Sequence, residues 1–236
     1  AAKGIPSTAA ITPIQFCEKY CQYVDEGYTD VIHVPINRSG SSTYNNAVMA
    51  QGMLREERPE HHLNIHLLDP HTYSMVFGWY LCEMARKLQN GAELRHVISE
   101  FETQMNKMEV ILGPYSLKQM KKSGRISAAA AVMGELMGIR PIITLIDGKT
   151  RVESKVRGDD KVIPAMIDLC KKRTEGVEDF DYMIGHTSIP QAAELEKACR
   201  KAFGKAPLVT FNLGGVVSAN TGPDTLALVY VGKPRD

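Results

Sequence analysis

The feature that most constrains how this chain folds is a regular alternation of short apolar runs with longer amphipathic runs. Residues 30–36 (DVIHVPI) and 64–69 (NIHLLD) are predicted strands, because each is a short apolar run bounded by turn residues. A helix is predicted before each strand: one begins at Thr12-Pro13, a favoured N-cap and first-turn pair, and the other covers residues 44–57. Strands separated by helices pair in parallel, so the first half is predicted to form a mostly parallel sheet.

The second half shows a different pattern, in which a hairpin is mixed with helices. Residues 141–146 and 151–156 are predicted to pair around Asp147-Gly148, a favoured two-residue turn. Further strands are predicted at residues 109–112, 181–185, 208–212 and 225–231, and helices at residues 116–122, 127–137, 160–173 and 190–203. We therefore predict an α/β protein of two domains. An N-terminal domain, residues 1–107, has a mostly parallel sheet with helices, and a C-terminal domain, residues 108–236, has a mixed sheet with helices.

Some local details are also predicted from the pattern. The first helix is expected to bury one apolar stripe: Ile14, Cys17, Cys21 and Val24. Thr187 or Ser188 is expected to cap the helix at residues 190–203, and a Gly-rich loop is expected between the last two strands.

Charge, cysteines and hydropathy each exclude a class of function. A net charge of +1 gives no basic surface field, so nucleic-acid binding is not expected. The five cysteines are scattered without a Cys-x-x-Cys pair, which favours a reducing, cytoplasmic compartment. Cys17 and Cys21 share one helical face, but no nearby His or Cys completes a site, so no metal is expected. The longest apolar stretch, residues 126–146, contains charged residues and a proline, and no membrane insertion is expected.

Residues 37–44 (NRSGSSTY) carry the clearest signal of ligand binding. The segment follows a predicted strand and precedes a predicted helix, and ligands of open parallel sheets bind beyond the carboxyl ends of strands. Four of five consecutive positions carry a hydroxyl, more than one N-cap needs, and a helix N-terminus offers N–H groups to an anion. Two further segments give weaker signals of ligand binding. Residues 214–224 are equally consistent with a plain connection between strands, and the arginine of residues 122–126 (KSGRI) either binds an anion or is solvated.

Motifs of catalysis and nucleotide binding are weak. Gly148-Lys149-Thr150 resembles the end of a phosphate-binding loop, but Ile143 stands where that motif requires glycine. No G-x-G-x-x-G sequence is present. His186 lies between a predicted strand and helix without a serine or cysteine elbow, so a structural role is favoured. A stand-alone phosphotransferase or hydrolase that uses His186 and the serine-rich loop remains the alternative.

Taken together and in order, these segments resemble the DegV family over nearly the whole chain. The loop at residues 37–44 is similar to the family's S-S-G-L-S-G-T-Y. Residues 117–127 (LKQMKKSGRIS) and 138–142 (GIRPI) are similar to its L-K-x-G-G-R-I-S and I-K-P-I segments, and residues 155–158 (KVRG) match the end of its hairpin. Residues 220–224 (NTGPD) stand in place of the C-terminal signature H-T-G-P-G.

The resemblance implies a fold and a function. DegV proteins have two α/β domains and an apolar lipid tunnel, in which a fatty acid lies with its carboxylate hydrogen-bonded at the domain junction. They serve as the fatty-acid-binding subunit of bacterial fatty acid kinase, whose separate ATP-binding subunit phosphorylates the carboxylate for phospholipid synthesis. By this resemblance the chain is expected to bind a long-chain fatty acid and present it to that kinase subunit. It is expected to be a cytoplasmic monomer, to need no cofactor and to catalyse nothing itself.

The resemblance also assigns residues. Four neutral donors are expected to bind the carboxylate: Thr8, Ser41, Ser42 and Asn220. Thr8 and Ser41 match the family's threonine and serine, Asn220 stands at the position of its histidine, and the second serine adds a neighbouring hydroxyl. Arg125 and Arg157 match arginines near the headgroup, which are expected to face the kinase or the transferred phosphate.

Several positions depart from the family pattern. Asn220 can donate a hydrogen bond but cannot carry a charge as histidine can, and Asp224 adds negative charge where the family has glycine. Residues 9–11 (AAI) replace S-Q-P, and Asn37-Arg38 replaces two serines. Typical members have several dozen further residues before the threonine motif, including a first strand. Either this chain is a divergent short form or that segment lies outside the given sequence, and a missing first strand would leave an exposed sheet edge.

The chemistry of a fatty acid agrees with these residue types. Each buried methylene contributes about 0.8 kcal/mol, so a long acyl chain offers roughly ten kcal/mol before ordering costs. A carboxylate in an apolar setting requires hydrogen bonds, which neutral donors supply. A binder of another small carboxylate or anion would need the same donors and no tunnel, so that alternative also stays open.

Overall fold

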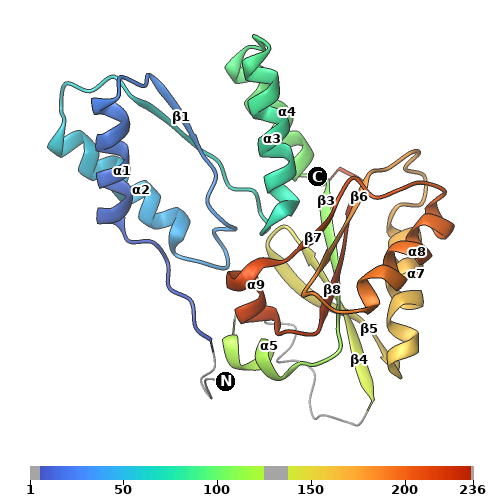
Figure 1. Cartoon of the computed structure of the whole chain (residues 1–236). Coiled ribbons are helices and arrows are strands. Elements are labelled where there is room, and N and C mark those ends of the chain that lie inside the picture. Colours follow the sequence, from blue (N-terminus) through green and yellow to red (C-terminus); the bar gives the residue numbers. More distant parts are fainter. Residues whose placement is uncertain (1–5, 125–137, 235–236) are drawn as a thin grey trace. The chain divides into compact units, whose positions relative to one another are not determined.

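The computed structural model describes residues 6–124 and 138–234, and the chain divides into two compact units (Figure 1). The small unit is Ala9–Tyr73. The large unit is Ala1–Thr8 together with Ser74–Asp236.

The small unit is a two-stranded parallel sheet with two helices. Its elements are α1 (Pro13–Asp25), β1 (Asp30–His33), α2 (Thr43–Glu57) and β2 (Asn64–Leu67). β1 and β2 pair in parallel with Val31 opposite Ile65, as the strand–helix–strand pattern predicts. Helix α1 begins at the predicted cap: Thr12 Oγ1 accepts a hydrogen bond from the Gln15 N–H, and the Gln15 side chain accepts one from the Thr12 N–H.

The buried face of α1 differs from the predicted stripe. Four residues of α1 form the core with three of α2: Phe16, Cys17, Tyr20 and Cys21 with Ala47, Ala50 and Leu54. Ile14, which the predicted stripe included, is 60% exposed. The predicted helical repeat is confirmed, but the helix is rotated so that Phe16 and Tyr20 face the core in place of Ile14. Their rings offer more apolar area than the Ile14 side chain.

A half-buried histidine contacts this core. His33, at the end of β1, has its Nδ1 2.5 Å from Tyr20 Oη and its ring centroid 4.8 Å from that of Phe16. Burial lowers the pKa of His33, because the charged imidazolium loses its hydration. The neutral imidazole is therefore the form that the folded small unit favours.

The large unit is built on a six-stranded mixed sheet in the order β5-β4-β3-β8-β6-β7. Its strands are β3 (Met108–Pro114), β4 (Ile139–Ile146), β5 (Lys149–Arg157), β6 (Tyr182–His186), β7 (Thr210–Asn212) and β8 (Thr225–Val231). Its helices are α3 (Met75–Gln89), α4 (Leu94–Met105), α5 (Lys118–Ser123), α7 (Val162–Arg173), α8 (Gln191–Phe203) and α9 (Gly214–Thr221). Neighbouring strands pair antiparallel except β6 and β7, which pair in parallel. The predicted mixed sheet is confirmed.

Helices α3 and α4 group with this sheet in the large unit. The boundary proposed from the sequence, near residue 108, assigns them to the N-terminal domain instead. They are separated at Asn90-Gly91, where Gly91 has a positive φ of 85°, a conformation that glycine adopts readily and that ends many helices.

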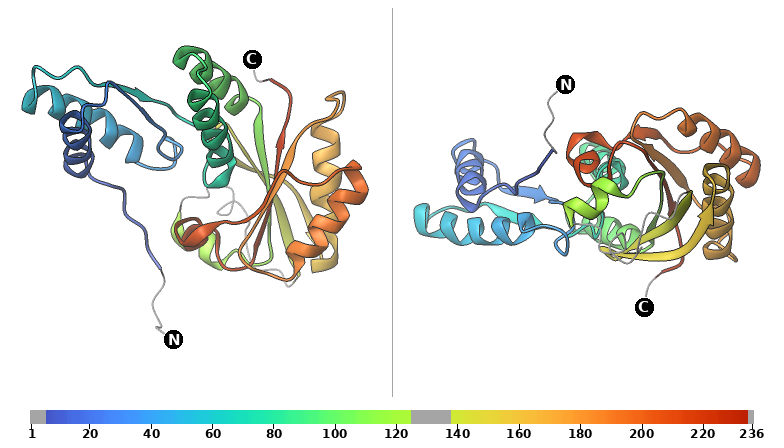
Figure 2. Two further views of the ribbon diagram at one scale, coloured as in Figure 1. Left: turned by 45° about the horizontal axis from the view of Figure 1, so that its top comes forward. Right: turned by 90° about the horizontal axis from the view of Figure 1, so that it is seen from below.

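Different helices cover the two faces of the sheet (Figure 2). Helices α7 and α8 pack on one face, where Met166 and Leu195 join Ile111, Ile184 and Leu228 in one core. Helices α3, α4, α5 and α9 lie on the opposite side. Strand alternation directs a second apolar set to that side, and each member is at most 7% exposed: Val110, Leu112, Ile143, Met183 and Val229.

The predicted hairpin is confirmed in its turn chemistry. β4 and β5 pair antiparallel around Asp147-Gly148, with φ values of 49° and 70°. Positive φ at both central residues is the type I′ geometry that matches strand twist.

Two local predictions for the last part of the chain are wrong. The Gly-rich segment between the final strands is not all loop, because α9 forms there and packs against α5. Pro190, rather than Thr187 or Ser188, caps α8. The Thr187 side chain makes a different hydrogen bond: its Oγ1 accepts the Thr225 N–H at 3.0 Å, which joins the loop after β6 to the start of β8.

One predicted element lies outside the described residues, namely the helix at residues 127–137. Within the described part of the chain, no helix is both long and apolar enough to cross a membrane.

A buried ion pair links three elements of the large unit. Glu109 of β3 is 5% exposed, and its carboxylate accepts hydrogen bonds from two guanidinium nitrogens of Arg173 on α7. Tyr230 Oη of β8 donates to Glu109 Oε2 at 2.6 Å. The hydrogen bond to Glu109 raises the pKa of Arg173, and burial raises that of Tyr230.

Candidate functional site

The carboxyl ends of β1 and β2 bring two polar loops together in the small unit. Asn37, in the loop after β1, is fully buried, and its Nδ2 donates to Tyr73 Oη at 3.0 Å. The Asn37 backbone N–H donates to the Thr72 carbonyl, also at 3.0 Å. The side-chain Oδ1 of Asn37 accepts from both the N–H and the hydroxyl of Ser39. Asn37 thus fixes the start of the serine-rich loop to the loop after β2.

Gly40 allows this approach. A Cβ built on Gly40 would lie 1.8 Å from Tyr73 Oη, far inside van der Waals contact. Only a residue without a side chain fits while Tyr73 keeps its place. The glycine of the serine-rich loop is therefore required by packing and not by its backbone dihedrals.

Ser41 and Ser42 stand at the N-terminus of α2. Ser41 Oγ lies 2.7 Å from Thr43 Oγ1 and accepts the Thr43 N–H at 3.2 Å, so this hydroxyl is held in place. Ser42 is the N-cap residue, is exposed, and makes no capping hydrogen bond with its side chain. The first turn of α2 contains no acidic residue. The partial positive charge of a helix N-terminus is therefore not neutralised by the helix itself.

Charged groups border the same loops. Asp69 Oδ1 accepts the backbone N–H of His71 at 3.0 Å, and Asp69 Oδ2 lies 3.6 Å from Arg38 Nε. The Arg38 side chain is 62% exposed, and its guanidinium lies over the Tyr44 ring at 5.7 Å. Among the described residues, the buried Thr72 hydroxyl has no hydrogen-bond partner. These loops combine fixed hydroxyls with one solvent-accessible cation.

In the large unit, Asn220 lies on α9 and its amide is partly used. Asn220 Nδ2 donates to the Val216 carbonyl at 2.8 Å, one helical turn back. Its own carbonyl accepts a hydrogen bond from Ser123 Oγ at 3.2 Å, which joins α9 to α5. The amide nitrogen has a second N–H, so Asn220 keeps one donor for a ligand.

The segment after Asn220 crosses the end of the sheet. Asp224 is exposed, and its carbonyl accepts the Tyr115 N–H at 2.8 Å, beside the end of β3. The Pro223 carbonyl accepts the Thr187 hydroxyl, beside the end of β6. Gly222 has a φ of 90°, and a Cβ there would lie 3.2 Å from Gln119 Cβ. The turn chemistry of the T-G-P sequence thus holds α9 over α5.

The remaining predicted residues are separate. Thr8 is half-buried and precedes α1; it belongs to the large unit with Asn220, whereas Ser41 and Ser42 belong to the small unit. Arg157 is exposed at the end of β5. Arg125 lies outside the described residues, directly after the left-handed Gly124 that ends α5. That the four donors converge on one carboxylate remains a prediction.

Residues of the types that enzymes use as bases and nucleophiles have structural roles in this chain. His186 Nδ1 accepts the Ser188 N–H at 3.0 Å, so it holds the turn after β6. Burial raises the pKa of Cys17 and of Cys199 to about 12, so both are neutral thiols at physiological pH. These groups are not activated for nucleophilic catalysis.

The chain matches a known family over almost its whole length. A family model described as "Uncharacterised protein, DegV family" matches residues 1–233. This chain belongs to the DegV family. A DegV domain-containing protein of Clostridium perfringens is 28% identical over 232 residues, covering 96% of this chain and 78% of that relative. One from Staphylococcus aureus is 28% identical over 237 residues, covering 98% of this chain and 79% of that relative.

Solved DegV structures share the fold. A stearic-acid-binding protein of Eubacterium ventriosum has a TM-score of 0.86 and 21% identity, covering 98% of this chain and 80% of that one. A fatty-acid-binding DegV protein of Streptococcus agalactiae has a TM-score of 0.84 and 26% identity, covering 99% of this chain and 81% of that one. Both are described as binding proteins and not as enzymes. The resemblance and the α/β fold predicted from the sequence are confirmed.

Sequence reasoning missed the loop after β2 in this DegV protein. Thr72 and Tyr73 follow β2 as the serine-rich loop follows β1, and parallel neighbours end at the same sheet edge. That geometric rule was the available signal. The hydrogen bond to Tyr73 in this loop also gives Asn37, which departs from the family's two serines, a defined role in positioning the serine-rich loop.

Proposed function

We propose that this DegV protein binds a long-chain fatty acid and presents the carboxylate to a separate kinase subunit. The observation that carries the proposal is the shared fold with DegV structures named for bound fatty acids, at TM-scores up to 0.86. The serine-rich loop supports it, because its hydroxyls are fixed beside a helix N-terminus without an acidic neighbour.

The headgroup is proposed to be bound by Thr8, Ser41, Ser42 and Asn220. A carboxylate taken from water must regain its hydrogen bonds, and hydroxyl and amide donors supply them without a permanent counter-charge. Ser41 can donate its hydroxyl proton to the carboxylate while its oxygen accepts both the Thr43 N–H and the Thr43 hydroxyl. Asn220 contributes its second amide N–H.

The acyl chain is proposed to lie in an apolar tunnel against the second face of the large sheet. That face is lined by buried aliphatic side chains and lies on the same side as α9, which carries Asn220. Burial of about 16 methylenes at about 0.8 kcal/mol each gives on the order of ten kcal/mol gross. The tail therefore supplies affinity, and the polar residues fix the depth of the head.

Phosphorylation is proposed to be the work of the partner kinase. The sequence contains no nucleotide-binding motif, which agrees with a division of labour between two subunits. Arg157 is exposed at the end of β5, so its guanidinium suits contact with a partner or with a phosphate. Arg125 is proposed for the same role on the basis of its motif.

The proposal is tested by titrating delipidated protein with palmitate and with the matching alcohol. Ser41→Ala should weaken palmitate binding by about ten- to a hundredfold, the value of one hydrogen bond to a charged group, and should leave alcohol binding less affected. Ser154→Ala, at an exposed position of β5, is the matched control and should bind as the parent does. Equal binding by Ser41→Ala and the parent would place the headgroup elsewhere.

The kinase role has its own readout. With an ATP-binding fatty acid kinase subunit added, Arg157→Ala should lower acyl phosphate formation while palmitate affinity is unchanged. Unchanged turnover in this variant would remove Arg157 from the proposed partner surface.

A further inference from the structure

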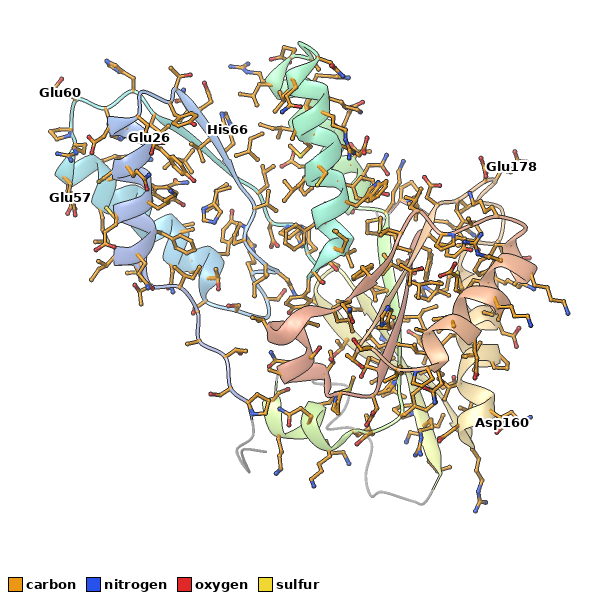
Figure 3. All side chains as sticks on the ribbon, viewed as in Figure 1. Glu26, Glu57, Glu60, His66, Asp160 and Glu178 are labelled. Carbon is orange, nitrogen blue, oxygen red and sulfur yellow. The ribbon has the colours of Figure 1, made fainter. Side chains whose placement is uncertain are left out.

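Three potential metal ligands meet within the small unit. Cys17 and Cys21 lie one turn apart on α1. Glu57 lies at the end of α2, the helix that packs against α1 (Figure 3). The two Sγ atoms and one carboxylate oxygen of Glu57 all lie within 4.8 Å of one another. The Cys21 thiol donates to Glu57 Oε2 at 3.6 Å. The fatty-acid proposal uses none of these residues.

The spacing fits a tetrahedral metal site. Zinc binds sulfur at about 2.3 Å and carboxylate oxygen at about 2.0–2.2 Å, so tetrahedral ligands are about 3.8 Å apart for two sulfurs and about 3.5 Å for sulfur and oxygen. The observed separation of Cys21 Sγ and Glu57 Oε2, 3.6 Å, already has this value. The other two pairs of ligand atoms lie within 4.8 Å, so rotation of the side chains brings them to the tetrahedral separations.

The scaffold holds the ligands in place. Cys17 is 1% exposed and Cys21 is 9% exposed, and both belong to the core in which α1 packs on α2. Glu57 is exposed, so the cluster opens to solvent on the carboxylate side. An ion can enter there without opening the core.

We propose that Cys17, Cys21 and Glu57 bind a thiophilic d10 divalent cation of the zinc class, with solvent water as the fourth ligand. Two thiolates select such an ion over magnesium or calcium, which prefer all-oxygen ligands. Binding releases the two thiol protons and joins α1 to α2 through the metal. From the sequence, no metal was expected at Cys17 and Cys21, because the third ligand, Glu57, is a carboxylate 36 residues from Cys21.

Cadmium is the probe, since its thiolate complexes have an ultraviolet charge-transfer band. Titrating the reduced, metal-free chain with Cd²⁺ should give a band that saturates at one equivalent, with a rise in melting temperature. Cys17→Ser and Cys21→Ser should each lose most of the band. Glu57→Gln should keep it but bind at least about tenfold more weakly, since even indirect metal partners are worth that much. Cys82→Ser, at an exposed cysteine on α3 of the large unit, should match the parent.

Several results would overturn the site. One is the absence of a saturable band in the parent with all thiols reduced. Another is a band that Cys82→Ser removes and Cys17→Ser retains. Because Cys17 is buried, its variant is checked by circular dichroism for folding. Glu57 is exposed, so Glu57→Gln is expected to fold, and equal affinity in that variant also refutes a three-ligand site.

Discussion

Gly40→Ala tests the geometry of the serine-rich loop most sharply. The added Cβ would lie 1.8 Å from Tyr73 Oη and 3.0 Å from its Cζ, so Tyr73 must move. Overpacking of this kind costs about 1–3 kcal/mol, and the buried Asn37 amide left without Tyr73 costs about 1–3 kcal/mol more. Replacing glycine by alanine also lowers the conformational entropy of the unfolded chain, which stabilises the folded state by about 0.4–1 kcal/mol and offsets part of this cost. We expect a net loss of about 2–4 kcal/mol in the local stability of the small unit.

Hydrogen exchange of peptides from residues 30–57, read by mass spectrometry, measures that loss as a free energy of opening. Tyr73→Phe removes the oxygen that the new methyl would strike, so Gly40→Ala should cost at least about 1 kcal/mol less in that background. Gly52→Ala is the matched control, because nothing lies within 4 Å of a Cβ built at this helical position. This change should stabilise the small unit by about 0.5–1 kcal/mol. Equal effects of Gly40→Ala in both backgrounds would refute the contact with Tyr73.

Three further predictions concern stability and are read by urea unfolding. Tyr230→Phe should lower the free energy of unfolding by about 1.5–3 kcal/mol, and Arg173→Ala by about 3–5 kcal/mol, because each change removes hydrogen bonds from the buried Glu109 carboxylate. Losses below about 0.5 kcal/mol would show that water replaces the removed hydrogen bonds. The pKa of His33 is lowered in the fold, so stability should fall as pH drops below the ordinary value of about 6.5 toward the lower folded value, and His33→Gln should flatten that dependence. Thr12→Ala should cost about 1 kcal/mol through loss of the α1 cap, and an unchanged midpoint would contradict the capping box.

The sequence predicted those elements whose signals are local. Thr12-Pro13 fixed the start of α1, and Asp147-Gly148 fixed the hairpin turn, since each depends on a cap or a dihedral preference of a few residues. Helix α9 was missed because glycines and β-branched residues disfavour an isolated helix, and packing on α5 decides its conformation. The burial of Ile14 was mispredicted because periodicity sets a helical repeat without choosing between neighbouring faces.

The candidate site was predictable where a motif carried it. Residues 37–44 were identified from their hydroxyl-rich pattern between a strand and a helix, and Asn220 was assigned by resemblance to the family. The structure supplies their partners: Tyr73 for Asn37 and Ser123 for Asn220. Those partners lie 36 and 97 residues away, a separation at which no local pattern acts. The proximity of Glu57 to the two cysteines of α1 could not be predicted for the same reason, because Glu57 is distant from them in the sequence.

The central claim, that this DegV protein binds a long-chain fatty acid, is tested most directly by what the purified chain carries. The protein is denatured and extracted with organic solvent, and the extract is analysed by mass spectrometry, for the parent, Ser41→Ala and the control Ser154→Ala. We predict a near-stoichiometric long-chain fatty acid in the parent and the control, and less in Ser41→Ala. Absence of fatty acid in the parent, with none taken up on incubation, would contradict the claim.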